Sequence, residues 1–129
     1  MQKLSIRSRA RTEMIDISAE VQCALEQEKA GASLCMVFVP HTTAAVTINE
    51  NADPSVRADI LAELNKVIPF DDGYTHGEGN SAAHVKASLV GSSVSVPVEE
   101  GRLCLGTWQA IYFCEFDGPR QRQAWIQAQ

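Results

Sequence analysis

The residues best suited to chemistry are the three histidines of the chain, at positions 41, 76 and 84. His76 and His84 stand eight positions apart in YTHGEGNSAAHVKAS, residues 74–88. Three neutral imidazoles with an open fourth position would form a zinc-like catalytic site, and other divalent metals also accept imidazole. The spacing matches no short metal motif such as HExxH. Three interpretations therefore stay open: a metal site, a partial catalytic role, and capping or surface histidines.

Further polar side chains stand at both ends of the segment HTTAAVTINENADP, residues 41–54. They are His41, Thr42 and Thr43 before its apolar middle, and Asn49, Glu50 and Asp53 after it. These groups could line the mouth of a pocket. In the alternative interpretation the threonines are ordinary strand formers and Asp53 only caps a helix. Asn49 and Glu50 have no comparably simple structural explanation.

Glu115 interrupts an apolar row in TWQAIYFCEFDG, residues 107–118. Strict alternation puts it on one face with Gln109, Ile111 and Phe113. A carboxylate among apolar neighbours must find a partner or raise its pKa, and both outcomes are typical of functional acids. The alternative is a glutamate that lies in solvent at the end of a strand.

A phosphate group is a further candidate ligand. The helix starts at Asp53 and Asn80 offer backbone amides, and Lys86 and Arg120 offer positive charge.

The elements that must position these side chains alternate between strands and helices. We expect a hairpin of strands in 3–9 and 12–17, a helix over 18–30 with Ser18 as N-cap, a strand over 33–40 buried on both faces, a strand over 44–50, a helix over 53–68, a short helix over 81–89, and an antiparallel meander beyond residue 91. The short helix would place Ser81, His84 and Ser88 on one side. Antiparallel strands mixed with helices indicate an α+β fold.

Size and composition fit one soluble domain of 129 residues, with 45% hydrophobic and 21% charged residues. The net charge of −5 and the absence of a run of Lys or Arg argue against nucleic acid or an anionic membrane as partners. The longest apolar run, LCMVFV, is too short to span a membrane, and no secretory segment is recognisable, so we expect a cytoplasmic protein. The four cysteines should be reduced core thiols.

Three segments resemble the YjbQ family, whose members are described as secondary thiamine-phosphate synthases. They are HTTAAVTINENADPSVRADIL, YTHGEGNSAAHVKASLVGSSVSVPVEEGRLCLGTWQAIYFCE and GPRQR, which together cover most of residues 41–122. The resemblance implies a single α+β domain with a mainly antiparallel, β-sandwich-like core, two longer helices and one short helix. It also implies a homotrimer with pockets near the subunit boundaries, and a divalent metal, zinc or magnesium, held by His41, His76 and His84.

The family pattern also keeps eight positions of this chain polar, which makes them pocket candidates: Asn49, Glu50, Asp53, Asn80, Ser88, Thr107, Gln109 and Glu115. Together with the residue types and spacing described above, they give the following expected roles. The expected catalytic residues are Glu115, Glu50, Asn49 and Gln109; the expected substrate-binding residues are Thr42, Thr43, Asn80, Ser81, Lys86, Ser88, Thr107 and Arg120. The chain departs from the family pattern at Gly79, where Asp is usual, at Ala82, where Pro is common, and in HTTAA, where the family tends towards HTSAG. The missing Asp removes a possible metal-side or base carboxylate.

The implied reaction joins a hydroxymethylpyrimidine pyrophosphate to a thiazole phosphate and releases pyrophosphate. The leaving pyrophosphate requires hydrogen-bond donors and a divalent cation, and the carbocation-like methylene requires a carboxylate or a ring nearby. Two alternatives remain. One is a metal-dependent hydrolase of a small phosphorylated or acyl substrate, and the other is a non-catalytic trimer that binds a small anion.

Overall fold

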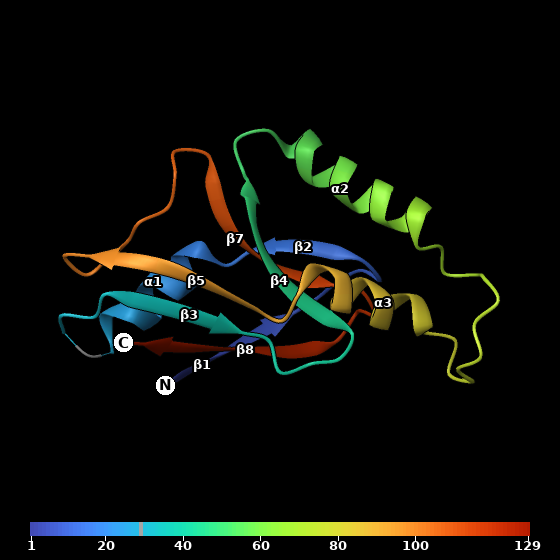
Figure 1. The fold of residues 1–129 in the computed structure, drawn as a ribbon, viewed down its shortest axis with the longest axis horizontal. Helices are drawn as coiled ribbons and strands as arrows, with labels where there is room; N and C mark the ends of the chain where they lie inside the picture. Colours follow the sequence, from blue (N-terminus) through green and yellow to red (C-terminus); the bar gives the residue numbers. More distant parts are fainter. Residues whose placement is uncertain (29) are drawn as a thin grey trace.

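The computed structural model describes residues 1–28 and 30–129, and in this part of the chain eight strands and three helices form (Figure 1). In chain order they are β1 (Gln2–Arg7), β2 (Glu13–Asp16), α1 (Ser18–Glu26), β3 (Leu34–Phe38), β4 (Ala44–Glu50), α2 (Pro54–Val67), α3 (Ser81–Val90), β5 (Ser93–Glu99), β6 (Arg102–Leu103), β7 (Gln109–Glu115) and β8 (Gln121–Ala128). The predicted α+β fold with an antiparallel core is confirmed.

The strands form two antiparallel sheets, with the orders β1-β8-β3-β5-β6 and β2-β7-β4. Alternating side chains of β7 divide the interior. Ile111 and Phe113 join the core that β3, β8 and α1 also build, whereas Ala110, Tyr112 and Cys114 join a second core with α2 and α3. β7, the central strand of the three-stranded sheet, is therefore buried on both faces.

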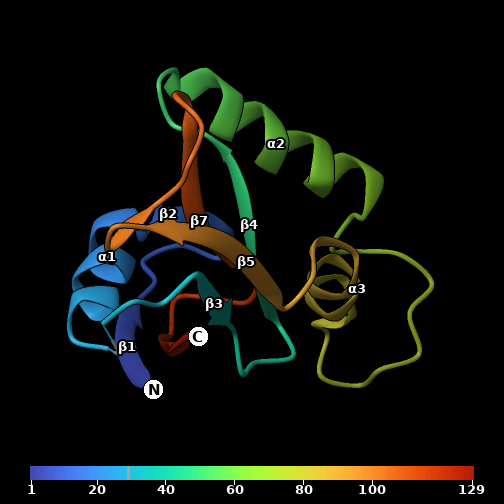
Figure 2. The same cartoon turned by 60° about the vertical axis from the view of Figure 1, so that its left-hand side comes forward.

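Helix α2 begins as its sequence predicts. Asp53 caps it by accepting a hydrogen bond from the Ser55 amide at 2.9 Å, and Pro54 occupies the first turn, where its missing N–H is not needed. The packing of α2 is loose, because none of its residues is buried and Ile60, Leu61 and Leu64 are only partly covered. Figure 2 shows α2 beyond β4, away from β1, β3 and β8.

The predicted hairpin of residues 3–9 and 12–17 is wrong. β1 pairs with β8 in the larger sheet and β2 pairs with β7 in the smaller one. The segment between β1 and β2 is hydrogen-bonded to the β7–β8 connection. The Ser8 amide donates to the Arg120 carbonyl, and the Gly118 amide donates to the Arg11 carbonyl. The predicted meander is also wrong beyond β5 and β6, since β7 and β8 belong to different sheets.

The predictions for the first helix, for the short helix and for the strand over residues 33–40 need correction. The first helix ends at Glu26, and the predicted extension to residue 30 includes position 29, which lies outside the described residues. Its N-cap is Ile17, while the Ser18 hydroxyl accepts a hydrogen bond from the Ile111 amide. The helix predicted to be short, α3, has 10 residues against 9 in α1. β3 is open on one face, where Leu34 and Met36 stay exposed.

The cysteines divide into two kinds. Cys35 and Cys114 are buried, as predicted, whereas Cys23 and Cys104 are exposed, so the prediction of four core thiols is wrong for two of them. Burial raises the pKa of the Cys114 thiol to about 12, which makes it unreactive near neutral pH. Among the described helices, none has the length and apolar character needed to cross a membrane.

Candidate functional site

Two of the three histidines line one cavity, between the β3–β4 connection and α3. The cavity has a volume of about 310 Å³, and its lining residues are His41, Thr42, Ala44, His84, Ala87, Ser88, Gly91 and Ser92. β3 ends before Pro40, which turns the chain so that His41 and Thr42 precede β4. On α3 the spacing of four between His84 and Ser88 places both on one face, as predicted.

His41 is held in one orientation by the first residues of β8. Its Nε2 accepts a hydrogen bond of 2.9 Å from the Gln123 amide, which assigns the ring proton to Nδ1. Burial and then the charge of Arg122 lower the pKa of His41, and the opposing charge of Glu115 does not reverse the shift. The imidazole is therefore neutral at pH 7, and its Nδ1–H is a hydrogen-bond donor.

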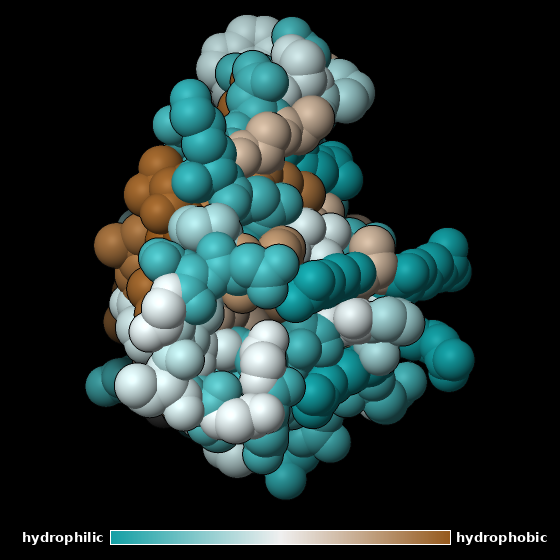
Figure 3. Space-filling view, turned by 90° about the vertical axis from the view of Figure 1, so that its right-hand side faces the viewer, coloured by the Kyte–Doolittle hydropathy of each residue, from teal (hydrophilic) through white to brown (hydrophobic). Residues whose placement is uncertain are grey.

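His84 also lines a second cavity, of about 300 Å³, with His76, Ser81 and Val85. The two imidazole rings stand edge to face, with centroids 5.6 Å apart. His76 Nε2 lies 3.7 Å from Glu78 Oε2 on the loop before α3. Figure 3 shows the face that carries this loop, where hydrophilic side chains predominate. His84 thus stands between two adjoining hollows of the surface.

The three histidines do not form one ligand set within a single chain. In residues 1–28 and 30–129 no group of three or more His, Cys, Asp or Glu side chains is placed to hold a metal ion. The Gln123 amide already occupies Nε2 of His41, the nitrogen that carries the ring's lone pair. Zinc or magnesium as cofactor stays a prediction, and no step proposed below passes through a metal.

Glu115 is buried in an ion pair and lies apart from the cavities. It is 0% exposed, and its carboxylate accepts hydrogen bonds from Arg122 Nη2 at 2.6 Å, Arg122 Nε at 2.9 Å and Ser8 Oγ at 2.6 Å. Burial raises the pKa of Glu115, but these hydrogen bonds and the charge of Arg122 outweigh it and hold the pKa below its ordinary value. The ionised carboxylate has the charge expected of a base or of a group that stabilises positive charge, although Arg122 and Ser8 already engage it, so a catalytic role for Glu115 stays a prediction. The alternative of a solvent-exposed Glu115 is wrong.

The other predicted catalytic residues lie at the opposite end of the smaller sheet. Glu50 pairs with Gln109 at one end of the β4–β7 ladder, whereas Ala44 pairs with Glu115 at the other. Six residue steps along a strand span about 20 Å, so Glu50 is far from the cavity that Ala44 lines. The side chains of Asn49 and Gln109 accept hydrogen bonds from nearby backbone amides, and Thr107 is exposed on the loop before β7. Within one chain, the end of the sheet that carries these residues therefore lies far from the histidines.

Lys86 does not fit the predicted phosphate ligand. Its side chain is fully buried, its Nζ donates to Asn65 Oδ1 at 2.5 Å, and it lies 3.8 Å from the centre of the Phe70 ring. The guanidinium of Arg11 lies 3.6 Å from the centre of the same ring. Burial, with a smaller contribution from the Arg11 charge, lowers the pKa of Lys86 to about 8. Two positions after His84, Lys86 points to the other side of α3.

This burial predicts a pH dependence of stability. The folded-state pKa of Lys86, about 8, lies below its ordinary value of 10.5, so the unfolded chain binds more protons between these pH values. The contribution of Lys86 to the free energy of unfolding should therefore rise from pH 8 to pH 10.5. Urea unfolding of the wild type and of Lys86→Met across this range measures it. We expect a smaller rise in the variant, and equal slopes would contradict the assignment.

Of the remaining residues predicted to bind substrate, some stabilise the fold and others line a cavity. Asn80 Nδ2 donates to Asp117 Oδ2 at 2.9 Å, and Arg120 binds the same carboxylate at 3.0 Å, so both brace the β7–β8 connection. Ser81 lines the second cavity, and Thr42 and Ser88 line the first. Thr43 is buried and accepts a hydrogen bond from Arg122 at 2.8 Å.

Sequence reasoning missed Ser92 and Gly91 in the cavity wall, and it missed Arg122 as the partner of Glu115. Gly91 ends α3, and Ser92 precedes β5, so neither belongs to a periodic segment. Arg122 had a signal, because alternation in RQRQAWIQ places it on the same face as Ala124 and Ile126, both buried. This alternation marks Arg122 as an arginine that needs a buried partner, but it does not identify Glu115 as that partner.

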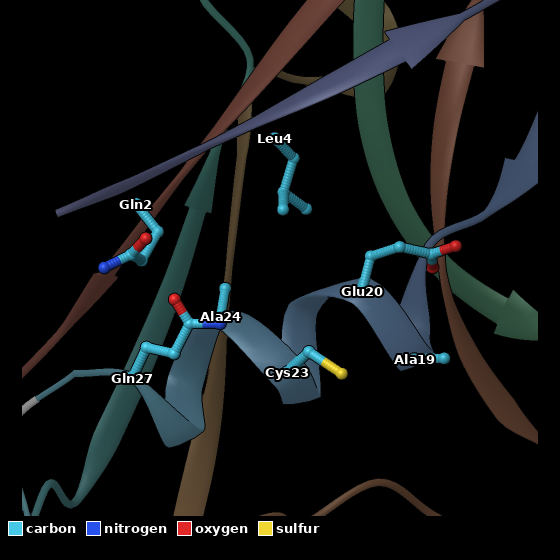
Figure 4. A pocket seen from close by; sticks show the side chains of 7 residues that line it. All are labelled: Gln2, Leu4, Ala19, Glu20, Cys23, Ala24 and Gln27. Atoms are coloured by element: carbon cyan, nitrogen blue, oxygen red, sulfur yellow. The ribbon is translucent and has the colours of Figure 1, made fainter.

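A cavity of about 370 Å³ lies on another side of the molecule, between β1 and α1. Figure 4 shows Gln2 and Leu4 from the strand facing Ala19, Glu20, Cys23 and Ala24 from the helix and Gln27 directly after it. Its lining includes none of the predicted site residues, and we assign it no chemistry.

The family model and the relatives found by comparison with known proteins carry the same family description. The family model described as "UPF0047 protein YjbQ-like" matches residues 2–129. The UPF0047 protein YugU of Bacillus subtilis is 50% identical over 98% of this chain and 96% of its own, and a UPF0047 protein of Methanocaldococcus jannaschii is 47% identical over 96% and 90%.

Solved structures agree with this placement. An uncharacterised YjbQ/UPF0047 family protein of Clostridium acetobutylicum superimposes with a TM-score of 0.97 at 48% identity, and a conserved hypothetical protein of Thermus thermophilus with 0.93 at 37%. In both cases all of each chain is covered.

Proposed function

Because the chain belongs to the UPF0047 (YjbQ-like) family, we propose that it acts as a thiamine-phosphate synthase-like enzyme on small phosphorylated substrates. In this proposal it joins a hydroxymethylpyrimidine pyrophosphate to a thiazole phosphate. The observation that carries the proposal is the cavity that His41 and His84 line together with Thr42, Ser88 and Ser92. Imidazole and hydroxyl groups are the donors that a phosphate or pyrophosphate requires.

The size of this cavity supports a pyrophosphate rather than a whole substrate pair. At about 310 Å³ it lies at the lower end of the range for small-molecule sites. The second cavity, of about 300 Å³, shares His84 with the first and adds His76 and Ser81. We assign the first cavity to the leaving pyrophosphate and the second to the phosphate of the thiazole.

In the proposed reaction the thiazole nitrogen forms a bond to the pyrimidine methylene carbon. The bond between that carbon and the pyrophosphate oxygen breaks, and pyrophosphate leaves with the electron pair. His84 donates a hydrogen bond to the departing oxygens, and the Nδ1–H of neutral His41 donates a second one. Such preorganised donors stabilise charge that develops in the transition state.

The reaction also requires negative charge near the methylene carbon, and no carboxylate is among the described residues that line the first cavity. Glu50 and Asn49 stand at the far end of β4. We therefore keep the homotrimer as part of the proposal, with the Asn49–Glu50 end of a neighbouring copy beside the cavity.

The same lack of a carboxylate favours a second candidate, a protein that binds a small anion without turning it over. The metal-dependent hydrolase remains a further alternative, but the histidines of one chain offer it no complete ligand set.

Incubation of the purified protein with both substrates, with magnesium and separately with zinc, tests the proposal. Thiamine phosphate as product, and growth of a strain that lacks the main synthase, would support it. Saturable pyrophosphate binding without any product would favour the second candidate. Release of phosphate from simple esters, or opening of lactones, would favour the hydrolase.

A further inference from the structure

Two consecutive residues at the start of β8 hold the segment that carries His41. The Gln123 amide donates to His41 Nε2 at 2.9 Å, and Arg122 Nη2 donates to Thr43 Oγ1 at 2.8 Å and to the Thr43 carbonyl at 3.4 Å. At these two residues β8 is paired with β1 alone, because its pairing with β3 begins at Trp125. The segment is thus attached to β8 at two points, beyond the end of the β3–β8 ladder.

The guanidinium of Arg122 is itself fixed. Its side chain is 5% exposed, and Nε and Nη2 both bind the carboxylate of Glu115. A planar guanidinium bound in this way has no freedom to rotate, so its bonds to Thr43 have a defined direction. Glu115 is oriented in turn by the Ser8 hydroxyl at 2.6 Å and the Asp117 amide at 3.1 Å.

We propose that Arg122, oriented by Glu115, is a positioning residue for the pyrophosphate site: it fixes Thr43, and with it the segment from His41 to Thr43, so that His41 keeps one tautomer and one place in the cavity wall. This inference rests on the proposed function, because it assigns a role at the same cavity. This role explains why Glu115 and Arg122 form a buried pair. Neither a catalytic role of Glu115 nor its exposure to solvent would explain that pairing.

The network also explains why two neighbouring threonines differ. Thr42 is exposed and lines the cavity, whereas Thr43 points inward to Arg122. Both threonines lie in a bend immediately before β4 and share one planar peptide bond, so fixing Thr43 also restricts the backbone of Thr42. The loss of the Arg122–Thr43 bond should therefore disturb both cavity-lining neighbours of Thr43.

The sharpest single variant is Thr43→Val, which removes the hydroxyl bonded to Arg122 and keeps a β-branched side chain. We expect the dissociation constant for inorganic pyrophosphate to rise about fivefold, the effect of one well-formed hydrogen bond. The matched control is Ser18→Ala. It removes a hydroxyl that accepts a hydrogen bond from the Ile111 amide of β7 and has no part in the Glu115–Arg122–Thr43 network, so pyrophosphate affinity should stay within about twofold while thermal stability falls.

A second variant keeps the test decisive if single changes unfold the protein. Glu115→Leu combined with Arg122→Met replaces the ion pair by apolar side chains, an exchange that buried pairs often tolerate. We expect it to fold, to bind pyrophosphate about tenfold more weakly or worse, and to give ¹⁵N NMR signals of His41 for a mixture of tautomers. The wild type and Ser18→Ala should show the Nδ1–H form alone.

Two results would overturn the inference. One is wild-type pyrophosphate affinity in both Thr43→Val and the double variant. The other is an equal loss of affinity in Ser18→Ala, which would mean that general destabilisation is responsible. If the wild type does not bind pyrophosphate at all, the proposed function fails; the tautomer comparison then decides alone, and an unchanged Nδ1–H form in the double variant rejects the positioning role.

Discussion

Replacing Arg122 by Met lowers the free energy of unfolding by about 3–5 kcal/mol, the typical loss when one partner of a buried ion pair is removed. The carboxylate of Glu115, which is 0% exposed, then remains inside the protein without its main donor. Its desolvation would no longer be offset. Urea or thermal unfolding monitored by circular dichroism measures the loss, which corresponds to a fall in Tm of roughly 10 °C or more.

The pH dependence of this variant separates a charge effect from a packing effect. In the wild type the pKa of Glu115 lies below its ordinary value of 4.5, so its contribution to stability is present above pH 4.5 and is lost as the pH falls. Without Arg122, burial dominates and the pKa of Glu115 rises above that value. The stability gap between wild type and Arg122→Met should therefore narrow on acidification.

The control is the Glu115→Leu, Arg122→Met double variant, which leaves no buried charge. It should recover most of the lost stability, and its gap to the wild type should also be smaller at low pH, because only the wild type then loses an ion pair. A loss below about 1 kcal/mol in Arg122→Met would show that Glu115 is not dependent on this partner, and would contradict the geometry described for the pair.

Replacing His84 by Ala has the largest expected effect on activity. His84 lines both cavities, so its loss removes the one imidazole that both proposed phosphate sites share. A side chain that donates to a leaving group contributes a factor of about 10² to 10⁴ in rate. We expect kcat/KM for thiamine phosphate formation to fall by at least about 10²-fold, measured from initial rates of product formation at substrate concentrations well below KM.

The matched control for His84→Ala lies on the same helix. Leu89 is 66% exposed and lines neither of the two cavities, so Leu89→Ala should leave kcat/KM near the wild-type value. Stability must be measured in parallel, because α3 also packs against β4. A His84→Ala enzyme that is folded and retains full activity would remove His84 from the proposed mechanism.

Local periodicity predicted the parts of the site that lie within one element. The helix period placed His84 and Ser88 on one face of α3, and strand alternation placed Glu115 inside. Asp53 and Pro54 marked the start of α2 because capping depends on adjacent residues. These features are set by the backbone geometry of a few consecutive positions.

Features that depend on distant segments could not be predicted in this way. Alternation shows that Glu115 points inward, but not that its partner is Arg122 on a strand of the other sheet. The predicted hairpin failed for the same reason, because β1 and β2 take partners from the end of the chain. Asn49 and Glu50 share a strand with the cavity residue Ala44, yet strand length separates them from the histidines.

The central claim about the proposed site is that the cavity between His41 and His84 binds pyrophosphate. An NMR titration of the ¹⁵N-labelled protein with inorganic pyrophosphate tests it most directly. We expect saturable chemical-shift changes at the polar residues of the cavity wall, which are His41, Thr42, His84, Ser88 and Ser92. The absence of saturable binding, or shifts centred on Asn49, Glu50 and Gln109 instead, would contradict it.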